Sequence, residues 1–304
     1  MDRVQVLMST YNGEKHLTEQ IVSLKNQTSV QMKLLIRDDG SSGETQKVLL
    51  SLKDNSLSIT LGSNVGIIDS FLDLLKKASE DTDYYSFCDQ DDVWKPNKLN
   101  RALSHLKTIP PNIPAMYCSR TELVDENLNH LGYWPPRPRK NALFANAIIE
   151  NIAVGCTVVI NSAARKLILS RVPDSSKVIM HDWWIYLCIS AFGRVIYDDE
   201  PTIMYRQHDS NSIGGTTSFV QKWSRKLMNF SRNRKRQLLR KQAQEFYRLY
   251  CEDLSKDKRT LIEKFLNSNS SLYKRISYCW KPGLYRHSII DNSLFRIMYL
   301  LNVI

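Results

Sequence analysis

Short hydrophobic runs alternate with amphipathic stretches through the first hundred residues of the chain. Each run is three to six residues long and is followed by a polar turn, which predicts strands. Between the runs, Leu, Ile and Phe recur every three or four residues, which predicts helices over 14–27, 45–52 and 67–78. This order predicts an α/β fold with a doubly wound, mostly parallel sheet. The predicted strands are Val4–Ser9, Lys33–Arg37, Ile59–Leu61 and Tyr84–Cys88.

The rest of the chain gives a coarser pattern without internal repeats. Helices are predicted over 97–107 and 181–192, and apolar strands over 155–160 and 203–206. From Phe219 onward the pattern is basic and helical.

Polar clusters follow three of the predicted strands directly. They are Ser9–Asn12, Asp38–Ser42 and Asp89–Asp92. Ligands of open α/β sheets gather at the carboxyl ends of the strands, so the three clusters are expected at one binding edge.

The cluster Asp89-Gln90-Asp91-Asp92 places three carboxylates within four residues. Carboxylates this close repel one another unless a cation lies between them, and oxygen ligands suit Mg²⁺ or Mn²⁺. The structural alternative is an acidic cap of the helix that follows. The other strand-end acids favour the metal site.

Asp38-Asp39-Gly40-Ser41-Ser42 also has two interpretations: a turn with a helix cap, or a carboxylate that accepts hydrogen bonds from a nucleobase or ribose. The chain contains neither a GxGxxG motif nor a GxxxxGK[ST] loop, which disfavours dinucleotide enzymes and P-loop NTPases.

Two further motifs carry candidate chemistry. In His181-Asp182-Trp183-Trp184, Asp182 is expected near a helix N-terminus beside two indoles, where it is either a general base or a capping acid. In Tyr205-Arg206-Gln207-His208, the histidine is either a metal ligand or a structural residue.

Taken together, these motifs resemble a family 2 glycosyltransferase of the GT-A fold. They occur in the family's order over residues 4–215. The Asp-Gln-Asp-Asp-Val-Trp and Tyr-Arg-Gln-His versions look most like bacterial rhamnosyltransferases of polysaccharide assembly. The motifs that carry the resemblance are Met8–Gly13, Arg37–Ser42, Asp89–Trp94, His181–Trp184 and Tyr205–His208.

The resemblance implies a role for each motif. Ser9 and Tyr11 would hold the base and ribose of a nucleotide sugar, Asp39 would accept a hydrogen bond from the pyrimidine, and Asp89 would contact the ribose. Asp91 and Asp92 would bind Mn²⁺ or Mg²⁺ on the diphosphate, and His208 would complete that site. Asp182 would be the base of an inverting transfer.

The resemblance also implies substrates. The favoured reaction transfers rhamnose from dTDP-rhamnose to a lipid-linked saccharide of a capsule, O-antigen or cell wall. The alternative within the family is a UDP-hexose or UDP-N-acetylhexosamine donor. The absence of a Gln-x-x-Arg-Trp motif argues for the addition of one or a few sugars.

The charge of the chain is concentrated at its C-terminal end. Residues 216–304 contain 19 Lys and Arg against 6 Asp and Glu, whereas residues 1–215 are nearly neutral. Nine basic residues and no acid lie in Lys222–Lys241, with Phe219, Trp223, Leu227 and Phe230 at helical spacing. Such a segment is typical of helices that bind anionic membrane surfaces. A solvated helix is the structural alternative.

These features predict two domains, a glycosyltransferase domain over 1–215 and a basic, amphipathic membrane-docking region over 216–304. No apolar run reaches the ~18 residues of a membrane span. The start of the chain predicts a strand rather than a signal peptide, so we expect a cytoplasmic protein attached to the inner face of the membrane. The alternative outside the enzymes is a non-catalytic protein that binds membrane or nucleic acid through its basic region. Nucleic acid is the less favoured of these two partners.

Overall fold

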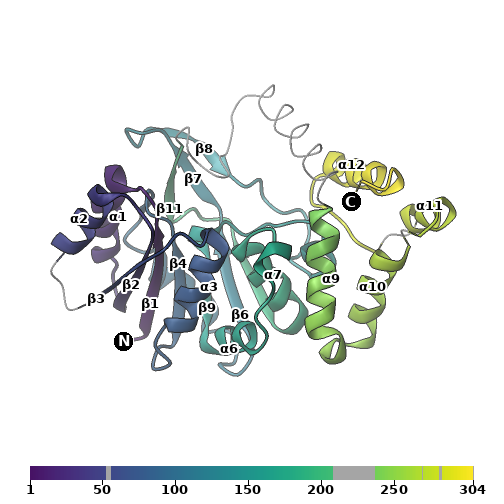
Figure 1. Cartoon of the computed structure of the whole chain (residues 1–304), viewed down its shortest axis with the longest axis horizontal. Coiled ribbons are helices and arrows are strands. Elements are labelled where there is room, and N and C mark those ends of the chain that lie inside the picture. Colours follow the sequence, from purple (N-terminus) through teal and green to yellow (C-terminus); the bar gives the residue numbers. More distant parts are fainter. Residues whose placement is uncertain (53–55, 208–236, 269, 281–282, 304) are drawn as a thin grey trace. The chain divides into compact units, whose positions relative to one another are not determined.

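A computed structural model of the chain describes residues 1–52, 56–207, 237–268, 270–280 and 283–303 (Figure 1). Its contacts divide the chain into two compact units. The first comprises the described residues of Met1–Arg137, Ala153–Ser170 and Gly193–Gly215. The second comprises those of Pro138–Ile152, Arg171–Phe192 and Thr216–Ile304.

A seven-stranded sheet forms the centre of the first unit, in the order β10-β6-β9-β4-β1-β2-β3. Neighbouring strands run parallel except β9, which is antiparallel to both β4 and β6. The predicted mostly parallel α/β sheet is therefore confirmed. The strands are β1 (Arg3–Thr10), β2 (Gln31–Asp39), β3 (Leu57–Gly62), β4 (Tyr84–Cys88), β6 (Ala115–Ser119), β9 (Val159–Asn161) and β10 (Arg194–Asp198).

The central strand β1 is buried from Val4 to Met8, as expected for a parallel strand covered on both faces. Amphipathic helices cover the sheet, and in α1 the side chains of Leu17, Ile21 and Leu24 form the buried stripe. The helices of this unit are α1 (Glu14–Lys25), α2 (Gly43–Ser51), α3 (Ile67–Lys77), α4 (Lys98–Leu106) and α6 (Ser162–Ser170).

A second sheet of four strands, in the order β5-β11-β7-β8, belongs to the same unit. Within it, β5 lies antiparallel to β11, so Trp94 pairs with Ile203 and Val93 with Met204. This pairing holds the segment after the acidic cluster against a strand from much later in the chain. The strands are β5 (Val93–Trp94), β7 (Thr121–Val124), β8 (His130–Trp134) and β11 (Ile203–Arg206).

The second unit is helical and packs around aromatic rings. The Phe246 ring lies 5.5 Å from Phe144, 6.1 Å from Trp184 and 5.1 Å from Tyr250, measured between centroids. A separate cluster gathers Tyr278, Phe295 and Tyr299 around Phe265. The helices are α5 (Phe144–Ala147), α7 (His181–Phe192), α9 (Leu238–Tyr250), α10 (Lys256–Asn267), α11 (Leu272–Trp280) and α12 (Ile289–Leu300).

One structural observation bears on the predicted domain boundary at residue 215. Residues 138–152 and 171–192, from within the predicted 1–215 domain, group with the C-terminal helices. The division into two functional domains stays a prediction. Most of the predicted basic segment Lys222–Lys241 lies outside the described residues.

Candidate active site

The acidic cluster Asp89–Asp92 forms the loop between β4 and β5. Ligand atoms of Asp89, Asp92 and Cys156 all lie within 4.8 Å of one another, and Asp92 and Cys156 are buried. Asp91 is not a member of this group. Cys156 enters it because a short turn, Gly155–Thr157, precedes β9.

The electrostatics of this group favour a cation. Burial raises the pKa of Asp92 well above its ordinary value, and the carboxylates of Asp91 and Asp89 raise it further. Burial and the carboxylates of Asp92 and Asp89 raise the pKa of the Cys156 thiol, which donates a hydrogen bond to Asp92. The remaining ligands are carboxylate oxygens, which fit Mg²⁺ or Mn²⁺.

Arg206 at the end of β11 contacts the acidic loop through both backbone and side chain. Its N–H donates to Oδ1 of Asp92 at 3.3 Å, and its Nε donates to the carbonyl oxygen of Asp91 at 3.0 Å. The strand therefore brings Arg206 against the acidic loop. The predicted ligand His208 lies outside the described residues.

Lys98 braces the acidic loop from the protein interior. Its buried ammonium lies 2.9 Å from Oγ of Ser86 on β4 and 3.3 Å from the centre of the Trp94 ring on β5. Burial lowers the pKa of Lys98 to about 7. One side chain thus contacts both strands that flank the loop.

The predicted nucleotide loop after β1 is joined to the acidic loop. Gln90 accepts a hydrogen bond from the N–H of Tyr11 at 2.8 Å and donates one to its carbonyl oxygen at 3.0 Å. A Cβ at Gly13 would stand 2.1 Å from Oε1 of Gln90, so a side chain there would displace the Gln90 amide from this position. The Tyr11 side chain is exposed, and the hydroxyl of Ser9 lies 2.6 Å from that of Ser70.

Asp39 at the end of β2 is buried and already holds its own loop. It forms an ion pair with Arg37 and accepts hydrogen bonds from the N–H groups of Val65 at 2.8 Å and Gly66 at 2.9 Å. Gly66 has φ +85°, a conformation that favours glycine, and caps α3. These contacts use three of the about four acceptor positions of the carboxylate.

Asp182 belongs to the second unit, in the first turn of α7 as predicted. Its carboxylate is buried and accepts a hydrogen bond from the N–H of Trp183 at 2.6 Å. The neighbouring His181 is buried, and burial lowers its pKa to about 3, so the ring is uncharged at neutral pH. The indole N–H of Trp183 donates to the Ala147 carbonyl at 2.7 Å, which fixes that side chain.

The structure therefore brings Asp89 and Asp92 together and ties Tyr11 to the acidic loop. Sequence reasoning missed Cys156 and Lys98. No spacing in the sequence pointed to Cys156, because the cysteines are scattered along the chain. All of them are free in the structure. Lys98 is the first residue of α4 and Trp94 lies on β5, so no helical spacing in the sequence could reveal the contact between them.

Comparison with known proteins gives a family match for this part of the chain. The model of the family described as glycosyl transferase family 2 matches residues 5–168, more than half of the chain.

Two relatives are similar in sequence. The dTDP-rhamnosyl transferase RfbG of Shigella flexneri is 29% identical over 235 residues, which cover 72% of this chain and 77% of RfbG. The UDP-Glc:alpha-D-GlcNAc-diphosphoundecaprenol beta-1,3-glucosyltransferase WfgD of Escherichia coli is 29% identical over 158 residues, covering 52% of this chain and 59% of WfgD.

Two solved structures share the fold. TarS residues 1–349 of S. aureus superpose with a TM-score of 0.62 at 15% identity, over 100% of this chain and 81% of that one. The mannosyltransferase PcManGT of Pyrobaculum calidifontis, solved with GDP-Man and Mn²⁺, gives a TM-score of 0.55 at 14% identity, over 99% and 85%.

Proposed function

The chain belongs to glycosyl transferase family 2, and from that premise we propose an inverting, metal-dependent transfer of rhamnose from dTDP-rhamnose to a lipid-linked saccharide. The product would enter a cell-surface polysaccharide. The observation that carries the proposal is the pairing of the Asp89 and Asp92 carboxylates at the carboxyl end of β4, in a loop bonded to Tyr11.

The donor is inferred from the relatives. RfbG is named as a dTDP-rhamnosyl transferase, and its similarity extends over most of both chains. A UDP-sugar is the alternative donor, supported by the name of WfgD and by a TarS structure in complex with UDP-GlcNAc, which gives a TM-score of 0.58 at 16% identity.

Donor binding is assigned to the first unit. Ser9, Tyr11, Asp39 and Asp89 would hold the nucleotide sugar. Asp91, Asp92 and His208 would hold Mn²⁺ or Mg²⁺, which supplies charge neutralisation for a departing diphosphate when bound. The carboxylates of Asp89 and Asp92 lie close together, which supports Asp92 as a ligand and puts Asp89 within reach of the same cation.

Asp182 is assigned as the general base. Its carboxylate would accept the proton of the acceptor hydroxyl as that oxygen bonds to the anomeric carbon. The bond from the anomeric carbon to the diphosphate breaks on the opposite face, so the configuration inverts. A positioned base of this kind contributes ~10²–10⁴-fold to the rate.

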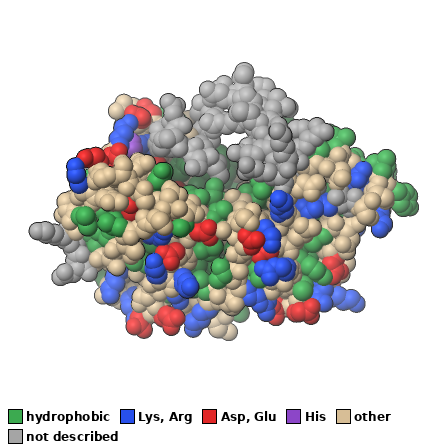
Figure 2. Space-filling view, viewed as in Figure 1, with side chains coloured by type: hydrophobic (Ala, Val, Ile, Leu, Met, Phe, Trp, Pro, Cys, Tyr) green, Lys and Arg blue, Asp and Glu red, His purple; other side chains and the backbone are tan. Residues whose placement is uncertain are grey.

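Attachment to the membrane is assigned to the C-terminal helices. Tyr273, Ile276 and Trp280 share one face of α11, and the exposed fractions of Tyr273 and Trp280 are 81% and 84%. Figure 2 shows hydrophobic and basic side chains next to each other at the right of the view. Aromatic side chains with polar tips favour the membrane interface, and basic neighbours favour anionic lipid. In the described part of the chain, no helix is both long and apolar enough to cross a bilayer.

The test measures nucleoside diphosphate release from dTDP-rhamnose, UDP-glucose, UDP-galactose and UDP-N-acetylglucosamine, over membrane extract that carries acceptor lipid. Each donor is assayed with Mn²⁺ and with chelator. We expect Mn²⁺-dependent release from dTDP-rhamnose alone. Release from a UDP-sugar instead would support the alternative donor. No release from any of the four would contradict these donors and point to an untested one, and failure to bind any donor as well would favour a non-catalytic binding protein.

A further inference from the structure

One face of α9 consists of buried polar and aromatic side chains. Gln242 and Glu245 are each only 1% exposed, and Phe246 is fully buried. Positions separated by three and four residues share a helix face, so the three side chains point the same way. All of them contact the segment that runs from Asp174 to Trp184 within the second unit.

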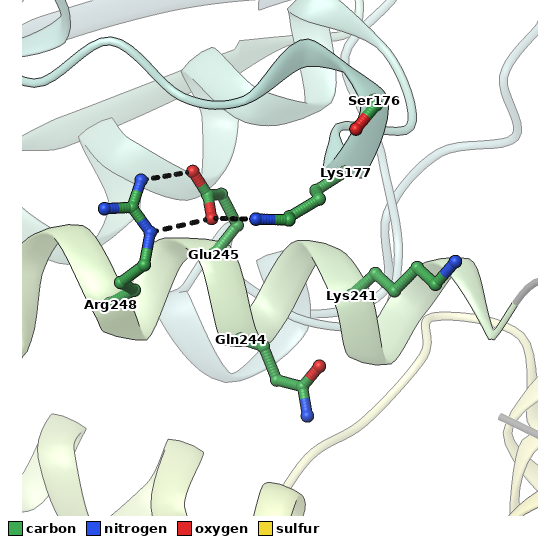
Figure 3. A pocket seen from close by; sticks show the side chains of 6 residues that line it. All are labelled: Ser176, Lys177, Lys241, Gln244, Glu245 and Arg248. Atoms are coloured by element: carbon green, nitrogen blue, oxygen red, sulfur yellow. Dashed lines mark hydrogen bonds and ion pairs between the residues drawn. The ribbon is translucent and has the colours of Figure 1, made fainter.

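The contacts on this face fix the backbone of that segment. Oε1 of Gln242 accepts a hydrogen bond from the N–H of Ile179 at 2.9 Å, and Oε1 of Glu245 accepts one from the N–H of Asp174 at 2.9 Å. The Lys177 ammonium lies 3.3 Å from Oε2 of Glu245. Figure 3 shows Lys177 and Arg248 converging on Glu245 from opposite sides.

The segment continues directly into α7. The Met180 carbonyl accepts the hydrogen bond that starts the helix, from the N–H of Trp184 at 3.0 Å. Asp182 stands between them, three residues after the bond at Ile179. On the far side of Asp182, Trp184 packs edge-to-face on Phe246. Helix α9 therefore holds the chain both before and after Asp182.

We propose that Gln242 and Glu245 are positioning residues for the transfer reaction and that they act through Asp182. They fix the N-terminus of α7, which fixes the direction of the Asp182 carboxylate. This inference rests on the proposed role of Asp182 as the base. It also gives the first described helix of the C-terminal region a part in turnover, in addition to membrane attachment.

The chemistry of the contacts separates positioning from simple packing. For stability alone, apolar side chains on this buried face would serve as well as a carboxylate does, since the carboxylate must be paired with cations. Hydrogen bonds to backbone N–H groups are directional, so they specify where the segment lies. A catalytic group displaced by about 1 Å can cost ~10²-fold in rate.

The test compares Gln242→Met and Glu245→Gln with Gln244→Ala on the same helix. Gln242→Met keeps the buried volume and removes the acceptor, and Glu245→Gln keeps the shape and removes the charge. Gln244 is a matched control because its side chain points away from Glu245 and Lys177 (Figure 3). Each variant is also made in an Asp182→Asn background, with kcat, KM for the donor, thermal stability and amide hydrogen exchange of residues 174–184 as readouts.

We expect Gln242→Met and Glu245→Gln to lower kcat by about 10-fold or more, within the range for a misplaced catalytic group, with donor KM unchanged. Amide exchange over 174–184 should accelerate in both variants and not in Gln244→Ala. In the Asp182→Asn background neither variant should lower the residual rate further.

Unchanged kcat in a folded, faster-exchanging variant would overturn the inference, as would an equal loss in the Asp182→Asn background. A variant that melts below the assay temperature is replaced by Gln242→Leu, under the same criteria. An inactive wild-type protein with every donor overturns the proposed function first, and the inference with it.

Discussion

The backbone N–H of Arg206 donates a hydrogen bond to Oδ1 of Asp92, 3.3 Å away, although the residues are 114 positions apart in the sequence. The bond fastens the end of β11 to the acidic loop after β4. Two residues further on is His208, the predicted third metal ligand.

Replacement of His208 tests the predicted metal site. We expect His208→Ala to raise the Mn²⁺ concentration for half-maximal activity by about 10-fold or more, as for loss of a ligand contact. His130→Ala is the control, since His130 is exposed and pairs with Glu122. Titration of activity with Mn²⁺ decides, and an unchanged midpoint in His208→Ala would remove this residue from the ligand set.

Asp92→Asn should separate function from stability. The carboxylates of Asp89 and Asp92 lie within 4.8 Å of each other and Asp92 is buried, so their repulsion destabilises the metal-free protein. We therefore expect the metal-free variant to melt at or above the wild-type temperature. Transfer activity should fall by at least about 100-fold, because several kcal/mol of charge neutralisation is lost. Retained Mn²⁺-dependent turnover would show that Asp92 is not needed.

Asp182→Asn tests the base. The amide cannot take a proton at neutral pH, so kcat should fall by ~10²–10⁴-fold. Binding of the nucleoside diphosphate with Mn²⁺, measured by calorimetry, should stay unchanged. Asp174→Asn is the control for loss of an acid in the same segment, because Asp174 caps the short turn before α7. Near-normal turnover in Asp182→Asn would place the base elsewhere.

Much of the fold could be predicted from periodicity. The strand–helix alternation of the first hundred residues and the helix over 181–192 are confirmed with small shifts at the ends. The direction of β9 could not be predicted, since an apolar run carries no information on its pairing partner. The predicted strand over 155–160 is in fact a short turn followed by β9 at 159–161, and this turn places Cys156 beside Asp92.

The site was predictable where its residues follow strands directly. Asp89 and Asp92 are found at the end of β4 as expected. The polar face of α9 was not predicted, because its residues Gln242 and Glu245 follow a basic segment whose charge suggested solvent, lipid or nucleic acid as its surroundings. Their partners at Asp174 and Ile179 are more than sixty residues earlier, a separation that no local pattern reveals.

The Glu245 carboxylate should make the free energy of unfolding depend on pH below the pKa that Glu245 has in the unfolded chain. The Arg248 guanidinium, aided by the Asp174 N–H and Lys177, lowers the pKa of Glu245 to about 2. The stabilisation is therefore complete above about 4.5, the value without partners, and is lost as the pH falls toward 2. We expect Glu245→Gln to lower the unfolding free energy by roughly 1–2 kcal/mol at pH 7, because Arg248 and Lys177 are partly exposed and solvent screens their charges. The gap to wild type in urea denaturation should narrow from pH 5 to pH 3, and a constant gap would contradict this origin.

Tyr273→Ser with Trp280→Ser tests the membrane face of α11. Loss of two interfacial aromatic side chains should lower binding to anionic phosphatidylglycerol vesicles by at least about 10-fold, since each buried side chain contributes ~1.5–3 kcal/mol. Co-sedimentation measures the bound fraction. The control is Leu50→Ser on α2, where the exposed fraction is 64%. Equal binding of the double variant and wild type would contradict this face.

The paired hydrogen bonds between Gln90 and the Tyr11 backbone join the predicted nucleotide loop after β1 directly to the acidic loop after β4. A cation that orders Asp89 and Asp92 therefore also orders the segment proposed to hold the base and ribose, before any nucleotide arrives. By thermodynamic reciprocity, the nucleotide must then tighten the cation by the same factor. The two ligands would bind as a cooperative pair, and the Gln90 side chain would carry the part of that coupling that does not come from direct contact between the diphosphate and the cation.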